Sequence, residues 1–249
     1  TVVIVTRHDS HAELVIDSLR ARKNVFVEKP LALNLEELKS ISSTYQKINE
    51  TEKTNLKLMV GFNRRFSPLI IKLKEKINYE KPISFIYTCN SGSIPSDHWT
   101  QDPNIGGGRL IGEACHFLDL IRYLADSPIK DIKLTEMKDQ KDIPDTFSLQ
   151  IKFLSGSIGS IHYYSNGAKS FPKERLEVFN SENIFCIDNF RKFQEWRKTG
   201  KKTKRLLRQD KGQLSCIKAF LEAVEFKNKM PIPPDQIFEV QSQLLKLKV

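Results

Sequence analysis

The sequence lacks several features that mark common classes of protein. No apolar run approaches the ~20 residues that a membrane-spanning helix needs, and no secretory signal is recognisable. The four cysteines are widely spaced and form no CxxC pair, which argues against a disulfide framework or a cysteine-based zinc site. The histidines and carboxylates also show no spacing typical of metal ligands. We therefore expect a reduced, cytoplasmic protein without a metal and without a membrane partner.

The sequence also lacks GxGxxG, the glycine pattern that cradles the pyrophosphate of a dinucleotide. The only glycine cluster, Gly106-Gly107-Gly108, precedes a helical pattern but follows a polar, proline-containing loop instead of a strand. This cluster is therefore not expected to bind a dinucleotide.

The charge is unbalanced, because 40 Lys and Arg residues against 30 Asp and Glu residues give a net charge of +10. Such an excess suits a phosphorylated cofactor, a nucleotide-linked substrate or nucleic acid. The densest basic stretch, residues 197–205, holds six basic residues but no interleaved aromatic residue. A solvated hairpin tip explains this stretch equally well, and we expect no nucleic-acid partner.

The first 61 residues alternate between strand and helix patterns. Strand patterns lie at 1–6, 24–28 and 56–60. Two capping-box patterns, Ser10 with Glu13 and Asn34 with Glu37, open the intervening helices. This order predicts a parallel sheet with right-handed crossovers. The chain opens on a buried-strand pattern at Thr1, and a buried parallel strand needs neighbours on both sides, so we expect the sequence to start inside a domain.

The pattern changes after residue 62. Strand patterns follow at 83–89, 146–154, 157–164, 175–180 and 184–188. Helix patterns cover 109–125, 212–227 and a final segment that starts near residue 233. The 249 residues, 39% of them hydrophobic, can build one large domain or two smaller ones. We predict an α/β fold followed by α+β: a partial Rossmann-like parallel sheet, then a C-terminal domain with a mainly antiparallel open sheet.

Polar residues follow the first two strand patterns. Ligands of parallel α/β sheets bind beyond the carboxyl ends of the strands. The first strand carries Thr6, Arg7 and His8 to that edge, and the stretch VFVEKPLAL carries Glu28 and Lys29 to the same edge. A lysine held there can donate or accept a proton, or polarise a substrate oxygen. The alternative interpretation is an ordinary polar turn, ended by a proline.

A second polar group lies before the glycine cluster, in the loop Ser96-Asp97-His98-Trp99. Trp99 could stack on the apolar face of a sugar ring while His98 bonds one of its hydroxyls. A purely structural aromatic residue in a loop is the alternative.

Several of these segments resemble one family when taken together. TRHDSHAELVIDSLRARKNVFVEKPLALNLEEL is similar to the middle of the nucleotide-binding domain of Gfo/Idh/MocA oxidoreductases. GFNRRFSPLI, GGGRLIGEACHFLDLIRYL and FPKERLEVFNSENIFCIDNF continue the resemblance into the second domain, closest to inositol and UDP-sugar dehydrogenases. The resemblance implies NAD or NADP as cofactor. It also implies a dinucleotide-binding domain that ends in residues 1–61 and a substrate-binding and oligomerisation domain over 62–249.

The resemblance also implies roles for individual residues. Lys29 and His116 correspond to the catalytic lysine and histidine, and Glu28 lies beside the cofactor. Thr6, Arg7 and His11 correspond to the turn and helix start near the nicotinamide ribose. Asn63, Arg64 and Arg65 correspond to the segment that enters the substrate cleft, where His98 and Trp99 would also lie.

Two departures from the family pattern matter. The family has an aspartate one turn before the histidine, where this sequence has Gly112 with Glu113 beside it; we expect Glu113 to orient the imidazole or reach the substrate. The family's GxGxxG precedes the point where this sequence starts, so two βα units are expected to be missing.

The predicted activity is hydride transfer between NAD(P) and a hydroxyl carbon of a sugar, nucleotide sugar or cyclitol. The alternative is a non-catalytic binding or assembly module, because the fingerprint is absent. A homodimer or tetramer through the C-terminal sheet is expected in both cases.

Overall fold

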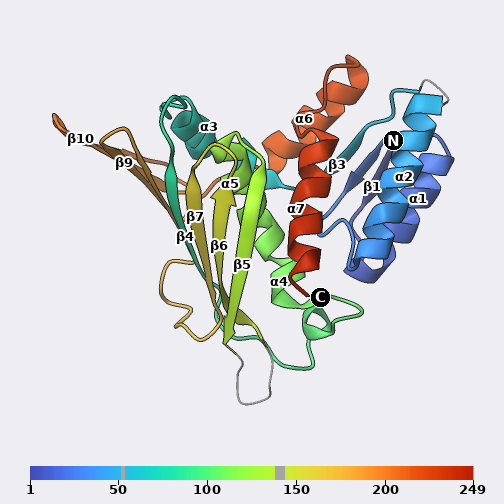
Figure 1. The fold of residues 1–249 in the computed structure, drawn as a ribbon, viewed down its shortest axis with the longest axis horizontal. Coiled ribbons are helices and arrows are strands. Elements are labelled where there is room, and N and C mark those ends of the chain that lie inside the picture. Colours follow the sequence, from blue (N-terminus) through green and yellow to red (C-terminus); the bar gives the residue numbers. More distant parts are fainter. Residues whose placement is uncertain (52–53, 138–143, 249) are drawn as a thin grey trace. The chain divides into compact units, whose positions relative to one another are not determined.

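The computed structural model describes residues 1–51, 54–137 and 144–248, which form two compact units (Figure 1). The first unit comprises 1–62, 97–119 and 214–249, and the second comprises 63–96 and 120–213. Each unit is thus assembled from separate stretches of the chain. These units are defined by packing, and the predicted domain boundary at residues 61 and 62 stays a prediction.

A three-stranded sheet lies in the first unit. Its strands are β1 (Val2–Ile4), β2 (Val25–Val27) and β3 (Leu58–Val60), in the order β1-β2-β3 and parallel throughout. Every residue of β2 and β3 is buried, as is typical of parallel strands covered on both faces. The predicted parallel sheet is therefore confirmed.

The crossover helices are α1 (His11–Arg20) and α2 (Leu35–Thr51) (Figure 1). The capping box at α2 forms as predicted: the backbone N–H of Glu37 donates to Asn34 Oδ1 (2.9 Å), and Asn34 Nδ2 donates to Glu37 Oε1 (2.8 Å). The capping box predicted at Ser10 does not form. Its hydroxyl donates to the carbonyl of Arg7 instead, because a short 3₁₀ helix, η1 (His8–Ser10), precedes α1.

Two C-terminal helices complete the first unit, α6 (Gln213–Glu225) and α7 (Pro234–Lys246). Phe220 of α6 packs against Phe26 of β2, with ring centroids 5.6 Å apart. Gln241 of α7 is fully buried and accepts the backbone N–H of Leu31 at 2.7 Å. These contacts tie residues near the C-terminus to the strand that carries Lys29.

The helix predicted over 109–125 is interrupted. The chain forms α4 (Gly108–Gly112) and α5 (Ala114–Ala125), with Glu113 between them at φ −123°. Another short 3₁₀ helix, η3 (Trp99–Gln101), precedes the glycine cluster. The single-helix prediction was wrong because the periodicity of apolar residues continues through a residue whose backbone leaves the helix.

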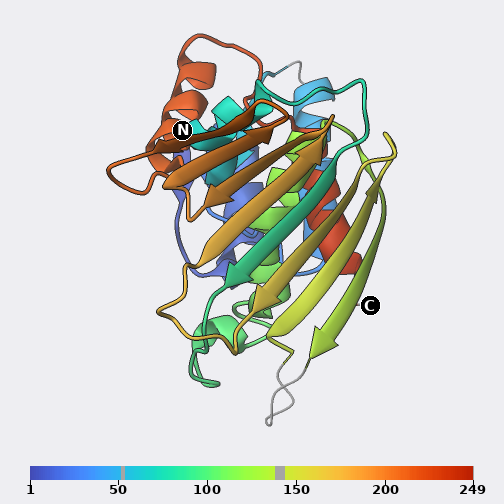
Figure 2. The same ribbon diagram turned by 90° about the vertical axis from the view of Figure 1, so that its left-hand side faces the viewer.

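The second unit contains an eight-stranded sheet in the order β11-β10-β9-β8-β4-β7-β6-β5 (Figure 2). The strands are β4 (Ser84–Asn90), β5 (Ile129–Met137), β6 (Thr146–Phe153), β7 (Ile158–Tyr164), β8 (Glu174–Asn180), β9 (Asn183–Asp188), β10 (Lys192–Arg197) and β11 (Gly200–Arg205). Neighbours pair antiparallel except β4 and β7, so the mainly antiparallel prediction is confirmed. β5, β10 and β11, with η2 (Asn63–Phe66) and α3 (Pro68–Lys74), are additions to the predicted elements.

The two faces of this large sheet differ. Buried side chains such as Tyr87, Leu149 and Val178 alternate along the strands with more exposed ones. Ile158 and Ile184 share the other face, because Ser84 and Phe179 connect them in register across the sheet, and they remain 52% and 38% exposed. Within the described ranges, none of the helices has the length and apolarity needed to cross a bilayer.

Candidate active site at the edge of the parallel sheet

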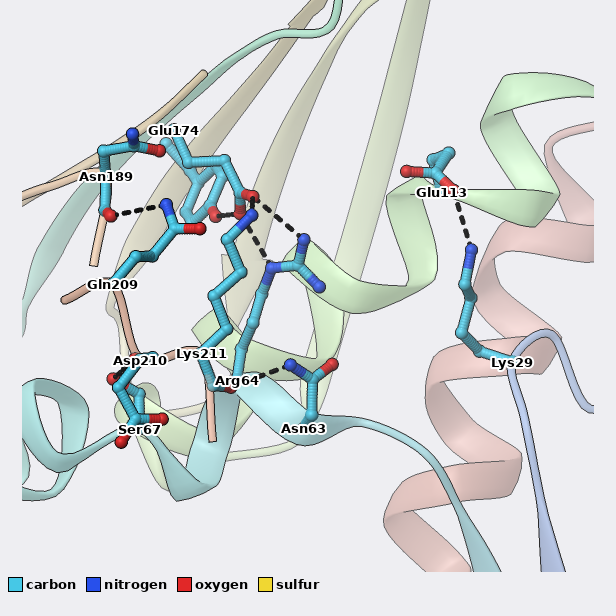
Figure 3. Close-up of polar contacts among 11 residues, drawn as sticks. Lys29, Asn63, Arg64, Ser67, Glu113, Glu174, Asn189, Gln209, Asp210 and Lys211 are labelled. Atoms are coloured by element: carbon cyan, nitrogen blue, oxygen red, sulfur yellow. Dashed lines mark hydrogen bonds and ion pairs between the residues drawn. The ribbon is translucent and has the colours of Figure 1, made fainter. Parts of the chain in front are cut away.

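Lys29 lies directly beyond the carboxyl end of β2 and forms an ion pair with Glu113 (Figure 3). Its Nζ donates to Glu113 Oε1 at 2.7 Å and to the carbonyl of Gly112 at 2.6 Å. The two charged side chains are only 15% and 25% exposed. An ammonium group has three N–H donors, so one donor of Lys29 remains for a ligand.

Glu113 reaches Lys29 because the chain leaves the helix at this residue. Its backbone N–H still donates to the carbonyl of Arg109, which ends α4, and its carboxylate turns toward the strand edge. The sequence had suggested that Glu113 orients His116 or reaches a substrate. The structure adds a partner that spacing did not indicate, the ammonium group of Lys29.

His8 is a further titratable residue at this edge and is 8% exposed. Its Nδ1 lies 2.8 Å from the carbonyl of Gly106, and its ring is edge-on to Trp99 with centroids 4.8 Å apart. Burial, with the positive charge of Lys29, lowers the pKa of His8 to about 4. His8 is therefore a neutral imidazole at physiological pH.

The glycine cluster makes this contact possible. A Cβ on Gly106 would lie 2.3 Å from the Cα of Thr100 and 2.6 Å from the carbonyl oxygen of Trp99. Only glycine therefore allows the chain to pass so close to η3 and present its carbonyl to His8. In this structure the cluster builds the wall of the site.

His11 is fully buried and joins the loops that follow β1 and β2. Its Nδ1 lies 2.7 Å from the carbonyl of Pro30, and its Nε2 lies 3.1 Å from the carbonyl of Thr6. These contacts make His11 a bridge between the two loops. Its predicted contact with a cofactor stays a prediction.

The other residues predicted for the cofactor offer polar groups along the same edge. Thr6 and Arg7 are exposed, and Arg7 lies 5.8 Å from the Trp99 ring centroid. Glu28 is half-buried against Gly61, where an added Cβ would come within 3.0 Å of its Oε1. A hydroxyl, a guanidinium and a carboxylate group along one edge fit the sugar and amide groups of a nicotinamide nucleoside.

The remaining predicted residues of the first unit have different surroundings. His116 lies in α5, is 7% exposed and packs edge-on against Phe62 at 6.4 Å. His98 is exposed, and its Nδ1 lies 2.8 Å from the hydroxyl of Thr100. Trp99 is half-buried between His8 and Arg7. Trp99 therefore lies close to His8 and Arg7, whereas His98 contacts its own loop.

Asn63, Arg64 and Arg65 belong to the second unit, and all three are buried. Asn63 Nδ2 donates to the carbonyl of Lys211 at 2.7 Å (Figure 3). The Arg65 guanidinium lies 5.0 Å from the Tyr123 ring centroid. These contacts stabilise the segment itself. The predicted role of Asn63 and Arg65 in substrate binding stays a prediction.

Arg64 belongs to a buried cluster centred on Glu174, at the start of β8 (Figure 3). Arg64 Nε donates to Glu174 Oε2 at 2.7 Å, Lys211 Nζ donates to Oε1 at 2.6 Å, and the Tyr87 hydroxyl also donates to Oε2. Burial alone would raise the pKa of Glu174, but the charges of Arg64 and Lys211 lower it to about 2. Sequence reasoning missed this cluster, because its members lie far apart and no local pattern marks them.

The described residues were also compared with the ligand sets of metal sites. Within the described part of the chain, no group of three His, Cys, Asp or Glu side chains could hold a metal ion.

Two sequence models of one oxidoreductase family match the chain. Residues 1–62 match the model described as "Oxidoreductase family, NAD-binding Rossmann fold", and residues 81–185 match the "GFO/IDH/MocA C-terminal domain". The chain therefore belongs to the Gfo/Idh/MocA oxidoreductase family, as the resemblance predicted. The first match also confirms that this is a family of NAD-binding proteins.

Curated relatives and solved structures agree with this assignment. Myo-inositol 2-dehydrogenase of Thermotoga maritima is 30% identical over 200 residues, which is 76% of this chain and 57% of that protein. The NAD(+)-dependent scyllo-inositol 2-dehydrogenase of Bacillus subtilis is 31% identical, over 76% of this chain and 55% of that protein. The chain thus spans somewhat more than half the length of these relatives.

Solved structures show the same fold. Levoglucosan dehydrogenase in complex with NADH superposes with a TM-score of 0.80 at 20% identity, covering 98% of this chain and 76% of that one. UDP-N-acetylglucosamine 3-dehydrogenase of Acidithiobacillus ferrooxidans gives 0.82 at 17% identity, covering 99% and 76%. At these identities the likeness concerns the fold alone.

Proposed function

We propose that this chain supplies the proton-transfer groups of a dehydrogenase that acts on a hydroxyl carbon of a cyclitol, sugar or nucleotide sugar. The observation that carries the proposal is the Lys29–Glu113 pair beyond the carboxyl end of β2, with one ammonium N–H left for a ligand. Membership of an oxidoreductase family whose relatives include inositol dehydrogenases supports the substrate class.

Each residue of the edge has a defined task in this proposal. In the direction of reduction, the Lys29 ammonium polarises the substrate carbonyl and gives its proton to the developing alkoxide. In the direction of oxidation, the Lys29 amine accepts the proton of the substrate hydroxyl, and the cofactor supplies the hydride chemistry. Glu113 holds the Lys29 side chain in place through its 2.7 Å hydrogen bond. His116 stays the predicted second acid–base or orienting group.

A nicotinamide cofactor supplies the hydride chemistry when it is bound. Thr6, Arg7 and Glu28 are the residues of this chain that would hold its nicotinamide side, because their polar groups line the same edge. The net charge of +10 favours an anionic ligand of this kind.

Two further parts of the proposal concern the protein's setting. Four buried thiols at wide spacing suit a reducing compartment, and we place the protein in the cytoplasm. The exposed apolar side chains on the large sheet support a homodimer or tetramer formed through that face.

The experiment is an assay of NAD(P)⁺ reduction with a panel of myo-inositol, scyllo-inositol, levoglucosan and UDP-N-acetylglucosamine. Lys29→Met is expected to lower kcat by about 100-fold or more, the scale of lost general acid–base catalysis, with a smaller effect on KM. Lys39→Met, which removes an exposed lysine of α2, is the control and should retain full activity.

Two results would count against the proposal. Wild-type activity in Lys29→Met would remove the lysine from the mechanism. A folded wild-type chain that neither binds NADH nor turns over any substrate would favour the non-catalytic alternative.

A further inference from the structure

His8 stands beside Lys29 without a role in the proposed mechanism. Gly112 links the two residues: its carbonyl accepts Lys29 Nζ, and a Cβ on Gly112 would lie 3.2 Å from His8 Cε1. The imidazole therefore packs against the same backbone that holds the ammonium group. All three residues belong to the first unit.

The hydrogen bond of His8 determines which ring nitrogen carries the proton. A carbonyl oxygen can only accept, so Nδ1, 2.8 Å from the carbonyl of Gly106, must be the donor. The ring is neutral at physiological pH, because burial and the charge of Lys29 disfavour a second proton. Nε2 is consequently a lone-pair acceptor, and this tautomer is imposed by the backbone of the glycine cluster.

We propose that His8 is a ligand-binding residue of this site, whose Nε2 accepts a hydrogen bond from a hydroxyl of the polyol held at Lys29. The inference rests on the proposed function and specifies its substrate class. Lys29 offers a donor, whereas His8 Nε2 and the Glu113 carboxylate offer acceptors. A polyol with two neighbouring hydroxyls can use both residues, because one hydroxyl accepts from Lys29 and the other donates to His8. A simple alcohol has one hydroxyl and leaves one of the two residues without a hydrogen bond to the ligand.

The competing explanation gives His8 only the task of tying the loop after β1 to the glycine cluster. Asparagine separates the two roles, because its Nδ2 lies near the place of His Nδ1 and can still donate to Gly106. The same substitution removes Nε2. His8→Gln is the complementary variant, because its terminal amide lies near the place of Nε2.

The first measurement is a ¹⁵N NMR spectrum of the chain in which only the five histidines carry the label. His8, assigned by the loss of its signals in His8→Asn or in His8→Gln, is expected to show a protonated Nδ1 and an unprotonated Nε2. Addition of myo-inositol should shift the His8 Nε2 signal, because a lone pair that accepts a hydrogen bond changes its shielding. A protonated Nε2, or a signal that no polyol moves, would overturn the inference.

The second measurement compares affinities for myo-inositol and for an analogue that lacks one hydroxyl. His8→Asn should weaken myo-inositol binding about 5- to 10-fold, as expected for one neutral hydrogen bond, and leave the matching deoxy analogue unchanged. His8→Gln should recover part of the loss. His162→Asn is the control, since His162 pairs with Ser148 in the second unit and should bind as the wild type does.

Failure of this inference can be told from failure of the proposed function. If His8→Asn weakens binding of myo-inositol and of the deoxy analogue equally, or weakens neither, His8 has only a structural role. Turnover that depends on Lys29 would still support the proposed function in that case. Absence of polyol binding in the wild type would overturn this inference, whereas the proposed function would be rejected only if no substrate of the panel were turned over. If His8→Asn does not fold, the His8→Gln affinity and the Nε2 signal of the wild type still decide the question.

Discussion

Glu174 illustrates how a single buried charge is stabilised in the second unit. The carboxylate is 1% exposed and receives hydrogen bonds from Arg64, Lys211 and Tyr87. Arg64 comes from η2, Tyr87 from β4 and Lys211 from the segment before α6. One side chain therefore joins three parts of the unit, and its removal would leave a buried guanidinium without its main partner.

Glu174→Gln is accordingly expected to lower the free energy of unfolding by about 3 to 5 kcal/mol, as is found when one member of a buried pair is removed. Chemical denaturation at neutral pH measures this change. Glu182→Gln is the control, because its pair with Lys198 leaves both side chains exposed (71% and 78%). That substitution should cost less than about 1 kcal/mol.

The same residue predicts a pH dependence of stability. The pKa of Glu174 is lower in the folded protein, about 2, than its ordinary value of 4.5. Its contribution is therefore fully present above pH 4.5 and is lost as the pH falls toward 2. Unfolding curves of the wild type and Glu174→Gln should converge over this acid range. Curves that stay parallel there would contradict the assignment.

At the scale of single elements, two helix starts that look alike in sequence differ in structure. Asn34 exchanges hydrogen bonds with Glu37 at the start of α2, whereas Ser10 bonds the preceding turn and leaves α1 without a side-chain cap. The pattern predicts caps at both places, and only the neighbouring 3₁₀ helix distinguishes them.

Asn34→Ala should therefore destabilise the protein by about 1 kcal/mol, the usual cost of a lost N-cap. Ser10→Ala should change the free energy of unfolding by less than about 0.5 kcal/mol, because the Ser10 hydroxyl makes only local hydrogen bonds, to Thr6 and Arg7. Thermal or urea denaturation of the two variants gives the comparison. Equal losses would mean that Ser10 caps α1 in solution.

Elements with strong periodicity could be predicted from the sequence, and weakly patterned ones could not. β6 alternates apolar and polar residues and β9 is a short continuous apolar run, and the prediction of both was close. β11, with the sequence GKKTKR, is exposed along its whole length, so no burial pattern marks it as a strand. It forms because β10 pairs with it as an antiparallel neighbour.

The candidate site could be predicted only where it depends on local sequence patterns. Lys29 could be placed at the sheet edge because the topology follows from local patterns. The partners of Lys29 and His8 could not be predicted, since 84 residues separate Lys29 from Glu113 and 98 separate His8 from Gly106. The interruption between α4 and α5 could not be predicted either, because the apolar periodicity continues through Glu113.

At the scale of the whole molecule, the outer face of the large sheet carries exposed apolar side chains among polar ones. Ile158 and Ile184 on this face are well exposed, and they lie on strands β7 and β9. Burial of such side chains against a second copy would account for their exposure in a single chain.

The double substitution Ile158→Lys with Ile184→Lys is expected to convert a dimer or tetramer into monomers, because it places charges within the apolar contact. Light scattering coupled to size exclusion measures the mass. Leu207→Lys is the control, since this leucine is 96% exposed but lies outside the strands. A wild-type chain that is already monomeric would contradict the proposed assembly.

The hydrogen bonds of Lys29 have a stereochemical consequence. Gly112 and Glu113 take two of its three N–H groups, so the third defines a single line of approach among the described residues. A freely rotating ammonium group would donate to a hydroxyl oxygen in many directions and would not distinguish epimers. In the proposed dehydrogenase, the held group would donate to the epimer whose hydroxyl oxygen lies along that line, and the epimer of opposite configuration at that carbon would have no donor. The pair with Glu113 would thereby make the site selective for one configuration at one carbon.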